Sequence, residues 1–172
     1  MTDKIRRLEE QLRDLLEGDR RSFPERRWNE LIAALDNIGD TTMAIVSYQR
    51  SGIGKETGTK YLRLFGYLQC IFLQQDSIRL LSRVLSKRWK DPERDTAWTE
   101  LRRVRNEIAG HPAERAAAVA RITMRSRGFR MVHWGLGRPK FEDVDLHSLT
   151  HRYLTEATAI LGGVVEAVKG GF

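Results

Sequence analysis

The sequence predicts a mainly α protein, a helical bundle of four to five helices with an added β-hairpin near residues 117–135. Apolar residues recur every three to four positions through most of the chain, as in amphipathic helices. A stretch from about 58 to 87 is apolar almost all round in its first half, which is typical of a central helix. The period falls to two only between 118 and 134. The length of 172 residues suits a single domain over residues 1–172.

Two helices are expected before the central one. The first spans residues 3–17, where leucine and isoleucine recur at helical spacing. The second follows Ser22, which can cap a helix, and Pro24, which suits a first helical turn. Its apolar pattern fades near Arg50, and the glycines of the segment 51–54 then predict a turn between helices.

The central helix is expected from about Gly58 to Lys87, and its second half is amphipathic. The pair Asp91-Pro92 breaks the chain, because proline cannot continue a helix. The next helix starts near Arg94. Its buried stripe is formed by apolar residues at helical spacing, which are Trp98, Leu101, Val104 and Ile108.

The change of period after this helix predicts β-structure. Residues 118–124 and 129–134 alternate loosely between apolar and polar side chains, and a turn joins them into a hairpin. The stretch that follows contains glycine and proline and is interpreted as a loop. Asp143 or Asp145 can then cap a last helix, which continues through about Lys169.

Simple counts exclude several classes of protein. No apolar run approaches the roughly 20 residues that a membrane-spanning helix needs, and the N-terminus shows no apolar signal segment. The single cysteine, Cys70, cannot form an internal disulfide or build a zinc site on several cysteines. We therefore expect a cytoplasmic protein that does not contact the membrane and needs no metal or other cofactor.

The positive charge is concentrated in one part of the chain. The segment 87–140 contains fourteen basic and six acidic residues, so its own net charge is +8. The net charge of the whole chain is +7, so the remaining residues together carry −1. Most of these cations are arginines, whose guanidinium groups bind phosphates well. The segment indicates a surface that binds RNA or DNA, although a solvated basic face without a partner fits the same pattern. The residues expected to bind RNA are Arg102, Arg103, Arg121, Arg125, Arg127 and Arg130.

A short constellation at the end of the fourth helix points to chemistry. Arg105 and Asn106 lie in its last turns. Gly110 is expected to stop the helix in a left-handed conformation, and Pro112 to push His111 out of the helical region. Residues six apart in a straight helix point about 240° away from each other. The break at Gly110 is therefore what allows Arg105 and His111 to converge.

Arg105-Asn106 followed by His111 resembles the signature of the HEPN superfamily, in which an arginine, usually followed by a polar residue, precedes a histidine in an all-helical domain. The resemblance covers roughly residues 24–112 and the final helix, with the hairpin as an addition to a single HEPN-like domain. It implies a metal-independent endoribonuclease that acts as a homodimer, as in toxins and phage-defence effectors, with an antitoxin or regulatory protein as a further partner. Arg105, Asn106 and His111 would then be the catalytic residues.

These residue types suit RNA cleavage without a metal. Histidine, whose pKa is ordinarily near neutrality, can take the proton of the 2′-hydroxyl or give one to the leaving 5′-oxygen. Arginine can stabilise the extra charge of the phosphorane, while Asn106 can hydrogen-bond a phosphate or orient His111. A dimer would supply two histidines to one substrate. The apolar surface for the second copy is expected from large groups on adjacent helices, which are Tyr61, Phe65, Phe72 and Trp98.

Other interpretations stay open at this point. Arg105 and His111 can merely cap a helix C-terminus, where cations are favourable, in a non-catalytic HEPN-like module that regulates a partner or holds a nucleotide. A basic nucleic-acid-binding protein without cleavage is a further alternative. His147 and His151 have a spacing that can bind metal, but no third ligand is evident, so we interpret them as an exposed pair.

Overall fold

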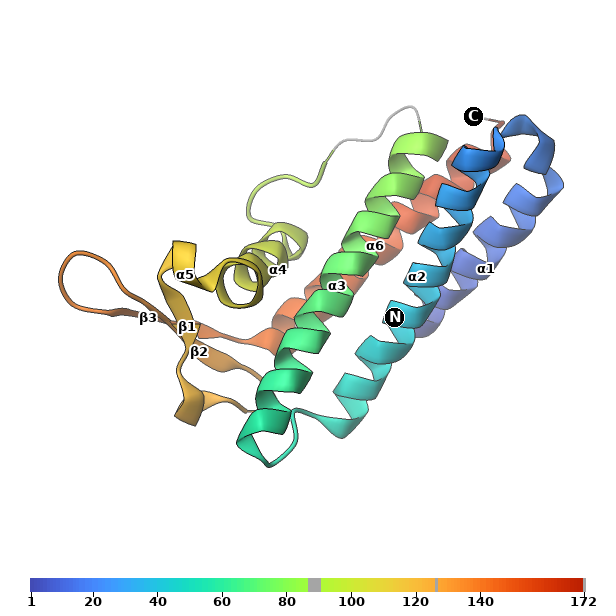
Figure 1. Ribbon diagram of the computed structural model, residues 1–172. Coiled ribbons are helices and arrows are strands. Elements are labelled where there is room, and N and C mark those ends of the chain that lie inside the picture. Colours follow the sequence, from blue (N-terminus) through green and yellow to red (C-terminus); the bar gives the residue numbers. More distant parts are fainter. Residues whose placement is uncertain (87–90, 126, 172) are drawn as a thin grey trace.

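The computed structural model describes residues 1–86, 91–125 and 127–171 (Figure 1). Within these residues the chain forms six α-helices and a small three-stranded antiparallel sheet, which confirms the prediction of a mainly α protein with an added β element. Four long helices run side by side, and α4, α5 and the sheet lie on one flank of them (Figure 1). No helix of the described segments has the length and apolar character needed to cross a membrane.

The four long helices come from both ends of the chain. Helix α1 spans Thr2–Gly18, α2 spans Glu25–Ser51, α3 spans Thr57–Leu85 and α6 spans Leu146–Lys169, and a short 3-10 turn lies between α1 and α2. Both α1 and α3 pack against α2 and α6, so the apolar stripes of all four helices face a common core. The predicted end of the central helix at Lys87 lies outside the described residues.

Polar side chains inside the bundle are joined to one another. The Tyr153 hydroxyl of α6 donates to Gln74 Oε1 at 2.8 Å, and Gln74 Nε2 donates to the Thr42 hydroxyl of α2 at 2.8 Å. The Tyr67 hydroxyl donates to the Thr150 hydroxyl at 2.9 Å. Because a buried polar group without a partner is costly, these bonds fix the relative positions of α2, α3 and α6.

Helix α4 spans Ala97–Arg105 and crosses the bundle beside α3 and α6. The Glu156 carboxylate of α6 accepts hydrogen bonds from the backbone amides of Ala97 at 2.9 Å and Trp98 at 2.8 Å. These amides are among the first-turn donors that a helix leaves unpaired, and a negative charge there is favourable. The Trp98 side chain is 1% exposed, so α4 is anchored to the bundle at its first turn.

Loss of this cap should destabilise the protein. We expect Glu156→Ala to lower the free energy of unfolding by about 1–2 kcal/mol, because two amides of α4 lose a charged acceptor. Urea denaturation measures the change. Glu166→Ala is the matched control on the same helix, since that exposed carboxylate pairs with Lys169 at the surface and its loss should change stability little. Equal losses in the two variants would show that Glu156 does not anchor α4.

The β element is a three-stranded sheet in the order β1-β2-β3. Strand β1 (Ala117–Val119) pairs antiparallel with β2 (Phe129–His133), which pairs antiparallel with β3 (Lys140–Val144). Alternate residues of β2 face the core, and Phe129 and Met131 are buried there. The sheet therefore packs against the end of the bundle from which α6 begins (Figure 1).

The predicted hairpin was right in position and incomplete in extent. The first strand is shorter than 118–124, because residues 121–123 form a 3-10 turn in which the Thr123 hydroxyl accepts from Arg130 N at 2.9 Å. Strand β3 was missed. It is mostly exposed and polar, so its sequence shows no period of two. Asp143 consequently lies on β3, and Asp145 caps α6 by accepting from Ser148 N at 3.0 Å.

Candidate active site

The motif lies where α4 changes its helical geometry. Asn106–Gly110 form a π-helical turn, closed by a hydrogen bond from His111 N to Asn106 O at 2.7 Å. The one-turn helix α5 (Pro112–Arg115) follows at once. Gly110 is not in the left-handed region, so the prediction of a left-handed stop was wrong: the helix widens into the π turn before it ends. His111 lies outside the helical region, as the proline after it predicted. Such π turns are rare and frequently mark functional sites.

The Arg105 guanidinium is held in one position from two sides. Its Nε and Nη2 donate to Gln69 Oε1 of α3 at 3.1 Å and 2.9 Å, and Nη1 donates to Asn106 Oδ1 at 2.9 Å. The group also lies 4.1 Å from the centroid of the Phe72 ring. Among the described residues no carboxylate pairs with Arg105. The positive charge of this fixed guanidinium is therefore not neutralised by the protein and can bind an anion.

The absence of a side chain at Gly110 makes room for this arrangement. A Cβ atom added there would lie 2.8 Å from Arg105 Nη1 and 3.5 Å from Asn106 Oδ1. The guanidinium therefore lies directly over Gly110, the residue before His111. A π turn that contained any larger residue at this point would displace the arginine from Asn106.

His111 stands at the exit of the π turn with its side chain 59% exposed. Its Nδ1 lies 3.7 Å from a Glu114 carboxylate oxygen, beyond hydrogen-bond distance. The structure thus joins the Arg105 and Asn106 side chains by a hydrogen bond and places His111 at the end of the same π turn. Within the described residues no hydrogen bond joins the Arg105 and His111 side chains, so their convergence stays a prediction.

The six arginines predicted to bind RNA fall into two groups. Arg102 pairs with Asp76 at 2.6 Å, Arg103 pairs with Glu107 and Glu142, and Arg130 pairs with Asp143 at 2.7 Å. These three cations are largely neutralised by the protein itself. The other three are exposed and form no ion pair with any described residue, and they are Arg121, Arg125 and Arg127.

A cluster of potential metal ligands lies next to the motif and was not predicted. Ligand atoms of Glu107, His133 and Glu142 lie within 4.8 Å of one another. Glu142 lies on β3, the strand that the sequence did not predict. These residue types can hold a divalent cation. In the structure, however, the Arg103 guanidinium hydrogen-bonds both carboxylates.

Arg103 and Glu142 each favour the charged form of the other. Burial opposes the charged form of Glu142, but the hydrogen bonds and charges of Arg103 and His133 outweigh it, so the pKa of Glu142 lies below its usual value. Burial also opposes a charged Arg103, and the two carboxylates more than compensate, so its pKa is raised. The cluster behaves as an ion-pair network that ties the sheet to the π turn.

The other histidines show no comparable setting. His147 and His151 are exposed on successive turns of α6, and in the described part of the chain neither belongs to a group of three potential metal ligands. His133 hydrogen-bonds Glu142 at 3.2 Å. Arg105, Asn106 and His111 thus remain the best candidates for chemistry, and Gln69 and Phe72 are the additional residues that position Arg105.

Comparisons of the chain with protein-family models, with curated proteins and with solved structures find no match. The functional conclusion therefore rests on the geometry of the candidate site and on the resemblance of its motif to the HEPN signature.

Proposed function

We propose that the protein is a metal-independent endoribonuclease of the HEPN type, with Arg105, Asn106 and His111 as catalytic residues in a homodimer. The observation that carries the proposal is the state of Arg105. Two amide side chains and an aromatic ring fix its guanidinium, no described carboxylate neutralises it, and the exposed His111 follows at the same turn. A merely structural arginine would more commonly pair with an acid, as Arg102 and Arg103 do.

The chemistry requires two proton transfers and one site of charge stabilisation. The 2′-oxygen of a ribose loses its proton to an imidazole and attacks the adjacent phosphorus. The bond to the 5′-oxygen then breaks, and that oxygen takes a proton from an imidazolium. The products are a 2′,3′-cyclic phosphate and a 5′-hydroxyl. Arg105 hydrogen-bonds the non-bridging oxygens, which carry most charge in the pentacoordinate state. Asn106 supplies a further polar contact and holds Arg105 in place.

A second copy of the chain would provide the second imidazole. One His111 cannot be base and acid in the same step, and the two functions are naturally divided between two protomers. The prediction that this copy would pack on an apolar surface of Tyr61, Phe65, Phe72 and Trp98 was partly wrong. Trp98 is buried in the core. The Phe72 ring is covered by the guanidinium groups of Arg102 and Arg105.

Helix α3 offers a different apolar strip beside the site. Leu62 is 76% exposed and Leu73 is 40% exposed. At about 100° per residue, Leu62 lies within about 20° and Leu73 within about 40° of Gln69, the residue that holds Arg105. Pairing of two α3 helices along this strip would bring two Arg105 groups to one interface around a two-fold axis. This strip is the surface we propose for the homodimer.

Cleavage should be independent of divalent metal. We expect purified protein to cut RNA at the same rate with and without excess EDTA, because Arg105 and His111 supply the charge and the proton transfers. The assay compares initial rates on one RNA under both conditions. Loss of activity with the chelator would refute the mechanism and transfer the chemistry to Glu107, His133 and Glu142. His133→Ala then serves as a second test, since it should leave a metal-independent rate intact.

RNA binding should depend on the arginines between β1 and β2 that form no ion pair with a described residue. We expect Arg121→Glu with Arg125→Glu to weaken RNA binding about tenfold or more and to reduce its salt dependence, because fewer phosphate contacts release fewer counterions. The control is Arg6→Glu with Arg7→Glu on α1, which changes net charge equally on exposed residues away from the sheet. If both double variants bind RNA equally, net charge and not this surface governs the affinity.

A further inference from the structure

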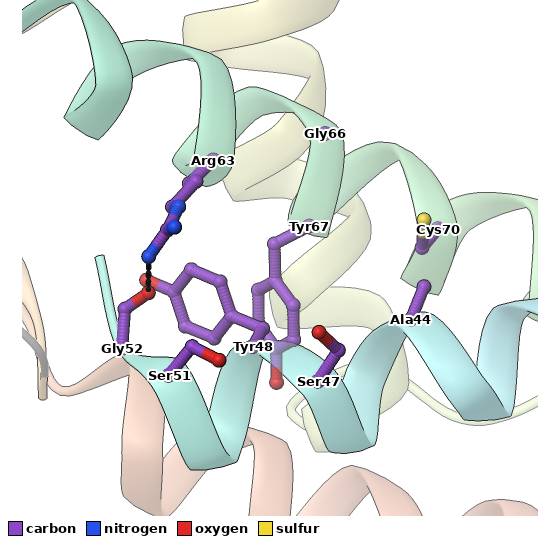
Figure 2. Close-up of a pocket in the computed structure, with 9 residues that line it drawn as sticks. All are labelled: Ala44, Ser47, Tyr48, Ser51, Gly52, Arg63, Gly66, Tyr67 and Cys70. Atoms are coloured by element: carbon purple, nitrogen blue, oxygen red, sulfur yellow. Dashed lines mark hydrogen bonds between the residues drawn. The ribbon is translucent and has the colours of Figure 1, made fainter. Parts of the chain in front are cut away.

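A pocket lies between α2 and α3, away from the candidate active site. It has a volume of about 280 Å³, with Arg63, Gly66, Tyr67 and Cys70 of α3 along one side and α2 along the other (Figure 2). A second pocket of about 200 Å³ adjoins it on the side of α6 and shares Tyr48, Gly52 and Tyr67 with it. We call the two together the tyrosine pocket.

The tyrosine pocket is positively charged. Arg63 lines the first part, and Arg127 and His147 line the second. Arg63 Nη1 donates to the Gly52 carbonyl at 3.1 Å, which leaves its charge unneutralised. Among the described residues that line either part there is no aspartate or glutamate, and neither arginine forms an ion pair with a described residue. No carboxylate of these lining residues would repel an anion in this space.

The pocket also contains a polar group without a partner. The Tyr48 hydroxyl is buried and has no hydrogen-bond partner among the described residues. Its ring stacks on Tyr67 with the centroids 3.9 Å apart, whereas the Tyr67 hydroxyl is already bonded to Thr150. A buried hydroxyl is normally satisfied, so one left free at a pocket calls for an explanation. Burial raises the pKa of Tyr48 to about 12, so the group remains a donor at neutral pH.

The pocket is separate from Arg105. Arg63, Tyr67 and Cys70 recur at intervals of three and four and share one face of α3. At about 100° per residue, that face lies roughly 150° around the helix from Gln69 and Phe72, which hold Arg105. A ligand of the tyrosine pocket therefore does not occupy the proposed catalytic site.

We propose that the tyrosine pocket binds a small organic phosphate with an aromatic body. The body would lie against Tyr48, Ala44 and Cys70, where Gly66 leaves the wall open. The phosphate would be bound by Arg63 and Arg127, with the Tyr48 hydroxyl donating to one of its oxygens. Both parts of the ligand are required. The arginines are exposed to solvent, so a phosphate alone would bind them weakly, and the aromatic wall offers no charged group that would hold an aromatic ring alone.

Calorimetric titration with phenyl phosphate tests the proposal. We expect saturable one-to-one binding, and at least tenfold weaker binding of inorganic phosphate and of phenol, each of which lacks half of the ligand. Arg63→Ala and Tyr48→Phe should each weaken binding of phenyl phosphate about tenfold. Failure of phenyl phosphate to bind at millimolar concentration, or equal binding of inorganic phosphate, would overturn the proposal.

A glycine variant locates the ligand without risk of unfolding. A Cβ at Gly66 would meet no atom within 4 Å, so Gly66→Leu fills the pocket from an open helix position and should preserve stability. We expect it to abolish binding, whereas Gly163→Leu, an equally open position on α6, should not. Unchanged binding to the Gly66→Leu protein would place the ligand elsewhere. Arg105→Ala should bind phenyl phosphate normally, so failure of the proposed ribonuclease activity does not affect this test.

Discussion

Replacing His111 with alanine should lower the rate of RNA cleavage by about 10²–10⁴-fold, the usual contribution of a positioned general acid or base. The fold should be unaffected, because the side chain is exposed and makes no hydrogen bond to a described residue. Initial rates on a single RNA measure the loss, and urea denaturation checks that stability is unchanged. In cells, expression of the wild type should arrest growth and expression of the variant should not.

Two matched variants separate chemistry from a general effect of losing an imidazole. His151→Ala removes an exposed histidine from α6 and should leave cleavage unchanged. Glu114→Ala removes the carboxylate 3.7 Å from His111 Nδ1 and should alter the rate far less than loss of the imidazole. Cleavage by His111→Ala protein at the wild-type rate would leave the motif as a helix end, and the protein would then be interpreted as a binding module.

The helices could be predicted from the sequence because each buries one periodic face. The apolar period that predicted α1, α2, α3 and α6 matches the structure, because a helix that buries one side needs apolar residues about every 3.6 positions. The sequence of strand β3 shows no such period. It contributes its backbone to β2 and only Val144 to the core, so its side chains show no alternation. The sheet was consequently predicted with two strands instead of three.

The candidate site was predictable only where it is local. Arg105, Asn106 and His111 are close in sequence, and the glycine and proline near them indicated a break in the helix. The residues that position Arg105 are not local: Gln69 lies 36 positions away and contributes a single side-chain oxygen. One of several glutamines on a mostly apolar helix gives no periodic signal for such a contact. The π turn was likewise invisible, since Gly110 is equally compatible with a left-handed stop.

Arg105→Ala should abolish measurable cleavage while leaving the dimer intact. The guanidinium would act on charge that is greatest in the transition state, and removing one such donor typically costs about 10²–10³-fold in rate. Arg105→Lys should recover little, because an ammonium group cannot reach Gln69, Asn106 and a phosphate with a planar set of donors. Sedimentation of the variant proteins reports the dimer, and Leu62→Glu with Leu73→Glu, which places charges on the exposed strip of α3, should separate the protomers and abolish cleavage.

Mixing two inactive chains tests whether one active site spans both protomers. Arg105→Ala homodimers keep both histidines and lack both arginines, and His111→Ala homodimers have the opposite defect. A mixed dimer has one Arg105 and one His111 at a shared site. Its single imidazole can make one of the two proton transfers and leaves the other to water, so we expect a rate above that of either parent but well below that of the wild type. If every protomer worked alone, the mixed dimer would contain no complete site and would stay inactive. Full cleavage by the separated Leu62→Glu, Leu73→Glu protein would likewise rule out the shared site, because a monomer offers a single His111 for two proton transfers.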